Sequence, residues 1–412
     1  MSFWAKLRQR KAPEREVVSL KSPVASSPEL SLAAGKPLMG GIADSLNAFG
    51  LRLLDEEASR APKKNVFISP LSVFLALAMA EVGAAGETKS AMRRALSLPA
   101  DASQEALNQA TLALMKKLQV AESLDLTIAN ALWVDIEATV AAQFQSVCQE
   151  VYDAAVQALE LSQPGAAMAI NQWVAEKTRG KIRDIVTPEA IAGAAAVITN
   201  AVYFRGKFSI PFPKEATQAK PFHLTNRSEK LVPMMRQKDL DGAYRHGKGV
   251  EAAVLNYEGS RIELYLLLPT EGVPPEDVLK EDRLPAFFVR DESFVLDLTM
   301  PRFTLDFTSR LKSSLTQMGM GRAFQHTGAD FTPLGSPLFF IGEVIHKTRL
   351  EVDEEGTVAA AATSLEVAVS AALRRIPEKR TLVFDRPFAV LLRDRISRAN
   401  LFAGVVYEPH TN

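Results

Sequence analysis

Cysteine is almost absent from this chain of 412 residues. Cys148 is the only one, so no disulfide can form within the chain, and cysteine usage does not require an oxidising compartment. The residues around it, 144–152, have a helix-like pattern. We therefore expect Cys148 to be a buried, inert thiol rather than a reactive one.

The chain also lacks an excess of either charge and lacks long apolar runs. Lys and Arg together number 48, as do Asp and Glu, so the composition indicates no nucleic acid as a partner. No run approaches the roughly 18 apolar residues of a membrane span. The first ten residues lack the apolar core of a signal peptide, so the sequence by itself predicts a cytoplasmic location.

Sequence signatures of catalysis are missing as well. There is no His-Glu-x-x-His, Gly-x-Ser-x-Gly, Walker or Gly-x-Gly-x-x-Gly motif. The five histidines are scattered and lack the spacing of metal ligands: His223, His246, His326, His346 and His410. We expect no enzyme activity, no metal and no cofactor.

The amino-terminal stretch differs in composition from the rest of the chain. Residues 1–38 are rich in Ser, Pro and charge, which predicts a disordered leader. Residues 39–412 contain no further linker and no internal repeat, so we expect them to form a single domain.

Within that domain the hydrophobic pattern changes from helical to strand-like. Helical spacing of apolar residues predicts helices in the first half, starting near residue 41 and covering 73–82 and 168–179. Alternating or apolar runs predict strands in the second half, over 261–268, 294–300, 339–352 and 382–393. Helices early and strands late are typical of an α+β fold.

The most informative stretch is residues 354–364, Glu-Glu-Gly-Thr-Val-Ala-Ala-Ala-Ala-Thr-Ser. Taken alone, its alanines favour a surface helix. As a strand it would place only uncharged, mostly small residues on one face, because successive strand residues point to opposite sides. That face would carry Thr357, Ala359, Ala361, Thr363, Leu365, Val367 and Val369. Such a strand could enter an existing sheet without overpacking it, and Gly356 supplies the backbone freedom that a hinge needs.

Several separated segments resemble motifs of the serpin family and follow the family's order. They include Asn65-Val-Phe-Ile-Ser-Pro-Leu-Ser72, Asn200-Ala-Val-Tyr-Phe-Arg-Gly-Lys-Phe208, Val232-Pro-Met-Met235, Ile345-His-Lys347, Pro387-Phe388 and Leu401-Phe-Ala-Gly404. With the hinge, the resemblance covers about residues 41–408. It implies a monomer with the serpin fold, which is α+β with about nine helices and three β-sheets. It also implies an exposed reactive-centre loop at about residues 354–385.

The resemblance implies functional positions too. A polar cluster under the central sheet, called the shutter, matches Ser69, Ser72, Asn200 and His346. The hinge of the loop matches Glu355, Gly356, Thr357, Ala359 and Ala361. The breach, where the loop first enters the sheet, matches Phe208. The family usually has Trp at this last position, and Phe keeps apolar bulk but lacks the indole donor.

Inhibitory serpins act as suicide substrates of serine proteases, and the resemblance implies the same function here. The loop is cut and inserts into the central sheet, which traps the acyl-enzyme. The uncharged inward face of the hinge favours this class. The alternatives are a non-inhibitory serpin-fold chaperone, carrier or storage protein, and a serpin directed at cysteine proteases. Many family members are extracellular, which is the alternative to a cytoplasmic location.

Family spacing places the cut between Ser370 and Ala371. The small apolar residues around this bond suit an elastase-like or subtilisin-like protease. A trypsin-like protease could instead cut at Arg374-Arg375 or Arg375-Ile376. The later bonds are less favoured, because four further residues would lengthen the segment between the hinge and the cut by about 13 Å. A longer segment would give the acyl-enzyme time to hydrolyse before insertion traps it.

Overall fold

The computed structural model describes residues 41–118, 124–259, 261–336, 339–356 and 377–410. All of them belong to the second of the chain's two compact units, Lys36–Asn412. The predicted leader, residues 1–38, lies outside the described residues. So do most of the candidate loop positions, namely Thr357, Ala359, Ala361, Ser370, Ala371, Arg374, Arg375 and Ile376.

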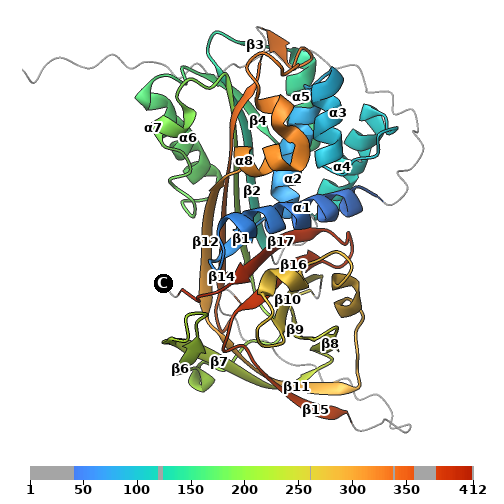
Figure 1. Cartoon of the computed structure of the whole chain (residues 1–412), viewed down its shortest axis with the longest axis vertical. Helices are drawn as coiled ribbons and strands as arrows, with labels where there is room; N and C mark the ends of the chain where they lie inside the picture. Colours follow the sequence, from blue (N-terminus) through green and yellow to red (C-terminus); the bar gives the residue numbers. More distant parts are fainter. Residues whose placement is uncertain (1–40, 119–123, 260, 337–338, 357–376, 411–412) are drawn as a thin grey trace, which may run out of the picture. The chain divides into compact units, whose positions relative to one another are not determined.

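The described residues contain eight α-helices, close to the predicted number (Figure 1). They are α1 (Gly41–Arg60), α2 (Pro70–Val82), α3 (Gly86–Ala95), α4 (Gln104–Leu118), α5 (Ala142–Tyr152), α6 (Pro164–Lys177), α7 (Pro188–Ile191) and α8 (Lys312–Leu315). Two of them begin earlier than predicted because a proline, Pro70 or Pro164, occupies the first turn, where it is favoured. None of these helices is both long and apolar enough to cross a membrane.

The strands form three large sheets, as expected for an α+β fold, and a two-stranded ribbon of β3 (Thr139–Val140) and β13 (Gly335–Ser336). The five-stranded sheet has the order β12 (Phe303–Arg310), β14 (Ile341–Val352), β5 (Ala196–Gly206), β2 (Leu124–Asp135), β4 (Ala155–Leu159). The six-stranded sheet has the order β1 (Val66–Ile68), β17 (Asn400–Val406), β16 (Phe388–Asp394), β10 (Ile262–Pro269), β9 (Val250–Asn256), β8 (Tyr244–Gly247). The four-stranded sheet has the order β15 (Glu378–Val383), β11 (Phe294–Pro301), β7 (Glu229–Asp241), β6 (Gln218–His223).

One predicted strand was wrong. Residues 382–393 do not form one strand but belong to two, β15 and β16, in different sheets. The chain leaves β15 after Val383 and crosses to the six-stranded sheet through Asp385, Arg386 and Pro387. A proline cannot donate to a strand ladder, which accounts for the break before Phe388.

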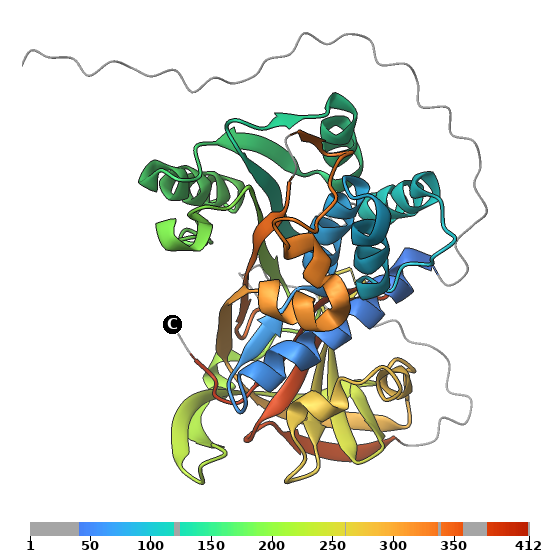
Figure 2. The ribbon, with the colours of Figure 1, turned by 45° about the horizontal axis from the view of Figure 1, so that its top comes forward.

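The five-stranded sheet is covered on both faces. Figures 1 and 2 place α6 and α7 on one face and α2 to α5 on the other. Ile170 and Val174 of α6 pack with Val197 of β5 in a small core of their own. On the opposite face α2, almost wholly buried, contacts β5, β2 and β17, so it lies between the five-stranded and six-stranded sheets. Side chains beneath the middle of the five-stranded sheet are therefore shielded from water.

Candidate functional site

The centre of the five-stranded sheet is a seam between two parallel neighbours. β14 and β5 are hydrogen-bonded directly to each other, with partners running from Ile341↔Ala196 to Leu350↔Phe204. β14 ends at Val352, and the next strand along the chain, β15, begins at Glu378 in another sheet. The residues that carry the candidate reactive bond thus follow directly, in the sequence, the strand that forms one side of this seam.

A row of polar side chains crosses the seam in register. His346 of β14 lies opposite Asn200 of β5, and Asn200 lies opposite Asn130 of β2. His346 Nδ1 contacts Asn200 Oδ1, and Asn200 Nδ2 donates to Asn130 Oδ1. All three side chains are buried. Strand pairing alone has therefore brought together groups that can hydrogen-bond one another.

Residues at the start of α2, including the turn before it, join this cluster by hydrogen bonds. The backbone N–H of Ser69 donates to His346 Nε2 at 3.1 Å, and the Ser69 hydroxyl donates to the carbonyl of Leu401 in β17 at 2.7 Å. Asn200 Nδ2 also donates to the Ser72 hydroxyl. The four predicted shutter residues, Ser69, Ser72, Asn200 and His346, are thus assembled in one buried network that ties both sides of the seam to α2. Their proposed role in sheet opening stays a prediction.

His346 is neutral in this environment. Its Nε2 accepts from Ser69, so the proton of the ring lies on Nδ1 and points to Asn200. Complete burial lowers the pKa of His346 from 6.5 to about 3. The histidine therefore acts as a fixed donor and acceptor and not as a titrating group near pH 7.

We expect His346 to make the folded protein sensitive to acid. Below about pH 6.5 the unfolded chain binds a proton at this residue that the folded chain does not. The free energy of unfolding should then fall by about 1.4 kcal/mol per pH unit from this residue as the pH drops toward 3. His346→Gln removes the titrating group, and its unfolding free energy, measured in denaturant between about pH 7 and 4.5, should vary less steeply. An equal slope for both proteins would contradict this assignment.

Asn130 belongs to the same network and was missed in the sequence. Its Oδ1 also accepts from the Ser72 hydroxyl, at 3.4 Å. A signal existed, because Leu126, Ile128, Leu132 and Val134 alternate around it, which would mark Asn130 as a polar residue on an apolar strand face.

The hinge is docked against the end of β5. The backbone N–H of Phe208 donates to the carbonyl of Glu355 at 3.1 Å, and that of Phe212 donates to the carbonyl of Glu354 at 2.7 Å. The Glu354 carboxylate accepts from the Thr217 hydroxyl at 2.8 Å and lies 3.5 Å from Arg302. These contacts hold residues 354 and 355 alongside the segment that follows β5, beside a cavity of about 740 Å³.

The hinge position Gly356 requires glycine. Its φ is +81°, and a Cβ atom there would lie 2.2 Å from the backbone nitrogen of Phe208. Its own N–H donates to the carbonyl of Asp353 at 3.1 Å, which closes a tight turn directly after β14. The chain can therefore reverse its direction at the end of the seam only with glycine at this position.

The breach position Phe208 is buried in an aromatic cluster. Its ring centroid lies 4.9 Å from that of Tyr257 and 6.0 Å from that of Phe212. Phe208 and Tyr257 also form an isolated antiparallel bridge. The apolar bulk expected at this point is present, directly under the docked hinge.

Elsewhere, the described residues contain no group of three or more His, Cys, Asp or Glu that could hold a metal ion. Cys148 is fully buried, as predicted, and burial raises the pKa of its thiol to about 12. An inert thiol follows, because the nucleophilic form of cysteine is the thiolate.

Comparison with known proteins gives a consistent answer. A family model described as serpin (serine protease inhibitor) matches residues 44–409. Serpin B6 of Pongo abelii is 31% identical over 382 residues, covering 90% of this chain and 100% of the relative. The solved structure of Serpin48 of the insect Tenebrio molitor, described as a highly specific serpin, is 26% identical with a TM-score of 0.79, covering 90% and 98% of the two chains. Human thyroxine-binding globulin, solved in complex with thyroxine, shares the fold at 24% identity and a TM-score of 0.80, covering 90% of this chain and 99% of that one.

The match spans most of the chain and nearly all of each relative. The chain belongs to the serpin family. The family is described by the inhibition of serine proteases and not by a catalytic activity, and thyroxine-binding globulin, which shares the fold, was solved in complex with thyroxine.

Proposed function

We propose that this serpin is an inhibitor of serine proteases that acts as a suicide substrate. The target's catalytic serine attacks a bond in the loop and forms an acyl-enzyme. The freed end of the loop then enters between β5 and β14 and carries the protease with it, and the distorted active site cannot complete hydrolysis.

The observation that carries this proposal is the closed parallel seam with a glycine turn at its end. β5 and β14 run in the same direction, so a strand that reverses at Gly356 would lie antiparallel to both and could satisfy the backbone groups of each. The sequence from Thr357 onward has uncharged residues on the face that would turn inward. Residues 357–370 would extend about 46 Å, enough to run the length of the sheet.

We place the reactive bond at Ser370-Ala371, which makes elastase-like and subtilisin-like proteases the favoured targets. We expect the protein to form a covalent complex with such an enzyme, visible on a denaturing gel. Mass spectrometry should find a released peptide that begins at Ala371. A peptide that begins at Arg375 or Ile376 would instead identify the later bond and a trypsin-like target.

Substitutions can show whether the protease cuts the early bond, Ser370-Ala371, or one of the later bonds after Arg374 or Arg375. Ser370→Arg should confer inhibition of trypsin, because specificity follows the residue before the cut. Arg374→Ala combined with Arg375→Ala should leave inhibition unchanged if the early bond is used. Absence of any covalent band with serine or cysteine proteases would favour the non-inhibitory alternative, a carrier, chaperone or storage protein.

A further inference from the structure

A cavity of about 470 Å³ lies between the six-stranded sheet and the strand β15 of the four-stranded sheet. Its walls come from the β8–β9 hairpin, from the end of β10, from Arg380 of β15 and from Arg386, which follows β15. No described residue of β5 or β14 lines it, so it is separate from the seam. Its volume falls within the range of roughly 300–1,000 Å³ that is usual for small-molecule sites.

Three cationic side chains in the cavity wall are held in place by uncharged groups. Arg386 Nη2 donates to the carbonyl of Pro269 at 2.9 Å. The guanidinium of Arg380 lies 5.3 Å from the centre of the Phe294 ring, and Lys248 Nζ donates to the backbone carbonyl of Asp282 at 2.7 Å. Contacts with carbonyl oxygens and with an aromatic face orient a cation but do not neutralise it.

The carboxylates that pair with these cations lie outside the cavity lining and are in contact with solvent. Glu378 is 2.8 Å from Arg380, but the two side chains are 60% and 44% exposed. Asp385 and Asp282 lie farther from their cations, at 3.8 Å and 3.9 Å. Exposed ion pairs of this kind contribute little to stability, so an anionic ligand can take the place of these carboxylates.

Glu251 is the one carboxylate in the cavity wall, and it is opposed by a buried cation. Glu251 accepts a hydrogen bond from the Tyr244 hydroxyl at 2.7 Å. Arg245, the next residue of β8, is only 6% exposed and has no ion pair among the described residues. Its Nη1 donates to the carbonyl of Tyr244 at 2.7 Å, and its Nε has no partner in the described part of the chain. A buried charge is screened less than an exposed one, so Arg245 adds to the positive potential at β8.

We propose that this cavity binds a small organic oxyanion, a phosphate ester or a carboxylate, through Arg380 and Arg386. A planar guanidinium presents paired N–H donors that match the geometry of both oxyanions, and Lys248 adds a third positive charge. The uncharged body of the ligand would pack against the apolar part of the wall, which includes Val250 and Leu268. Such a site is an addition to the proposed function and does not depend on it.

Titration calorimetry of the full-length protein tests the proposal with phenyl phosphate, benzoate and inorganic phosphate as probes. Sodium chloride keeps the ionic strength constant. We expect phenyl phosphate to bind about fivefold more tightly than inorganic phosphate, because only its ring can use the apolar wall. The tighter of phenyl phosphate and benzoate identifies which oxyanion the site prefers. Arg380→Met and Arg386→Met should each weaken binding by about tenfold or more, as expected for the loss of one charged hydrogen bond.

Lys379→Met is the matched control, because Lys379 precedes Arg380 in β15 and therefore points to the opposite face of the strand. Its ammonium lies 3.0 Å from Asp239 and does not line the cavity. The substitution removes the same charge from the same strand and should leave the affinity unchanged. Glu251→Gln should tighten binding severalfold, since it removes a like charge while its amide oxygen can still accept from Tyr244.

Arg386→Lys guards against a loss of structure, because it keeps the charge and loses only the paired donors. It should weaken the binding of phenyl phosphate as well. If the wild type binds no probe beyond the effect of sodium chloride, the cavity is not an oxyanion site and the inference is wrong. Equal losses of affinity in Lys379→Met and Arg380→Met would also overturn it, since they would show a general response to charge. No readout involves a protease, so the outcome is independent of the proposed function.

Discussion

Thr357→Arg should convert the protein from a trap into an ordinary substrate. Thr357 is the first residue after Gly356, and strand parity places it on the inward face once the loop has entered the seam. An unpaired charge forced into the interior costs several kcal/mol. We expect the variant to fold normally and to be cut at the same bond, with the yield of covalent complex reduced at least about tenfold.

Val358→Arg is the matched control, since the same charge then falls on the opposite face of the strand. It should retain most of the trapping activity. Covalent complex is quantified on denaturing gels at increasing ratios of serpin to protease. A Thr357→Arg protein that traps protease with unchanged stoichiometry would contradict the insertion mechanism and favour the non-inhibitory class.

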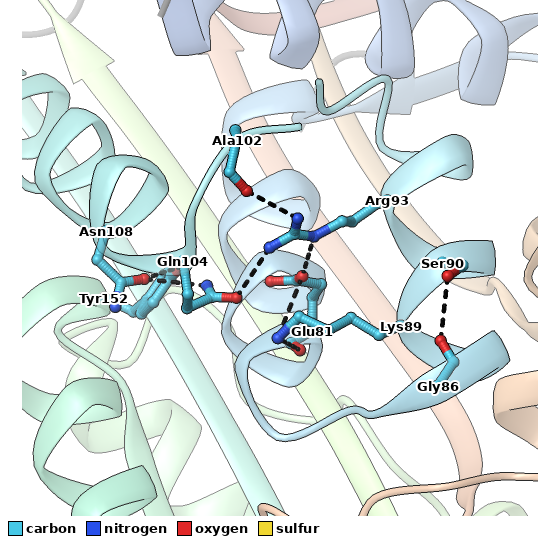
Figure 3. Close-up of polar contacts among 9 residues, drawn as sticks. All are labelled: Glu81, Gly86, Lys89, Ser90, Arg93, Ala102, Gln104, Asn108 and Tyr152. Carbon is cyan, nitrogen blue, oxygen red and sulfur yellow. Dashed lines mark hydrogen bonds and ion pairs between the residues drawn. The ribbon is translucent and has the colours of Figure 1, made fainter. Parts of the chain in front are cut away.

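Arg93→Met should destabilise the fold by about 3 kcal/mol or more, because it leaves a buried carboxylate short of its main partner. Figure 3 shows the arrangement: Arg93 of α3 reaches Glu81 of α2, whose side chain is only 1% exposed. Arg93 Nε donates to the Glu81 carboxylate at 2.6 Å, and its other nitrogens donate to the carbonyl of Ala102 and to Gln104 at the start of α4. One guanidinium therefore connects three helices. Lys89, 3.5 Å from the same carboxylate, compensates only in part.

Two further variants distinguish lost charge pairing from lost packing. Arg94→Met, at an exposed position of the same helix, should change the free energy of unfolding by less than about 0.5 kcal/mol. Adding Glu81→Gln to Arg93→Met should restore part of the stability, since the buried charge is removed. If the double variant is as unstable as the single one, packing of the Arg93 side chain and not the ion pair accounts for the loss. Denaturant unfolding followed by fluorescence measures all of these values.

Local signals in the sequence predicted much of the site. The resemblance of short segments to family motifs pointed to Ser69, Ser72 and His346, and the structure brings these residues into one network, while their role in sheet opening stays a prediction. Asn130 was missed because its importance arises only from its pairing with Asn200 on the neighbouring strand, and the two residues are 70 positions apart in the sequence. The Glu81–Arg93 ion pair was not predicted for a similar reason, because a glutamate in an apolar helix does not indicate which cationic side chain will pair with it.

The sequence was least informative where the chain changes sheets. Residues 382–393 have an apolar pattern that is compatible with one long strand, and only Pro387 indicates a break. Tertiary packing decides that β15 pairs with β11 while β16 pairs with β10 and β17. Pattern alone cannot specify such pairing, because all of these partners are distant in the sequence.

The pairing of β1 with β17 has a consequence for how the molecule is made. Val66 pairs with Val405, and the Ser69 hydroxyl donates to the carbonyl of Leu401, so β1 and the polar cluster both depend on β17, which is synthesised long after them. A nascent chain whose β17 is still in the ribosomal exit tunnel already has the seam-forming strands β5 and β14, but β17 cannot yet support them. The closed seam can therefore acquire its full support only after β17 has left the exit tunnel.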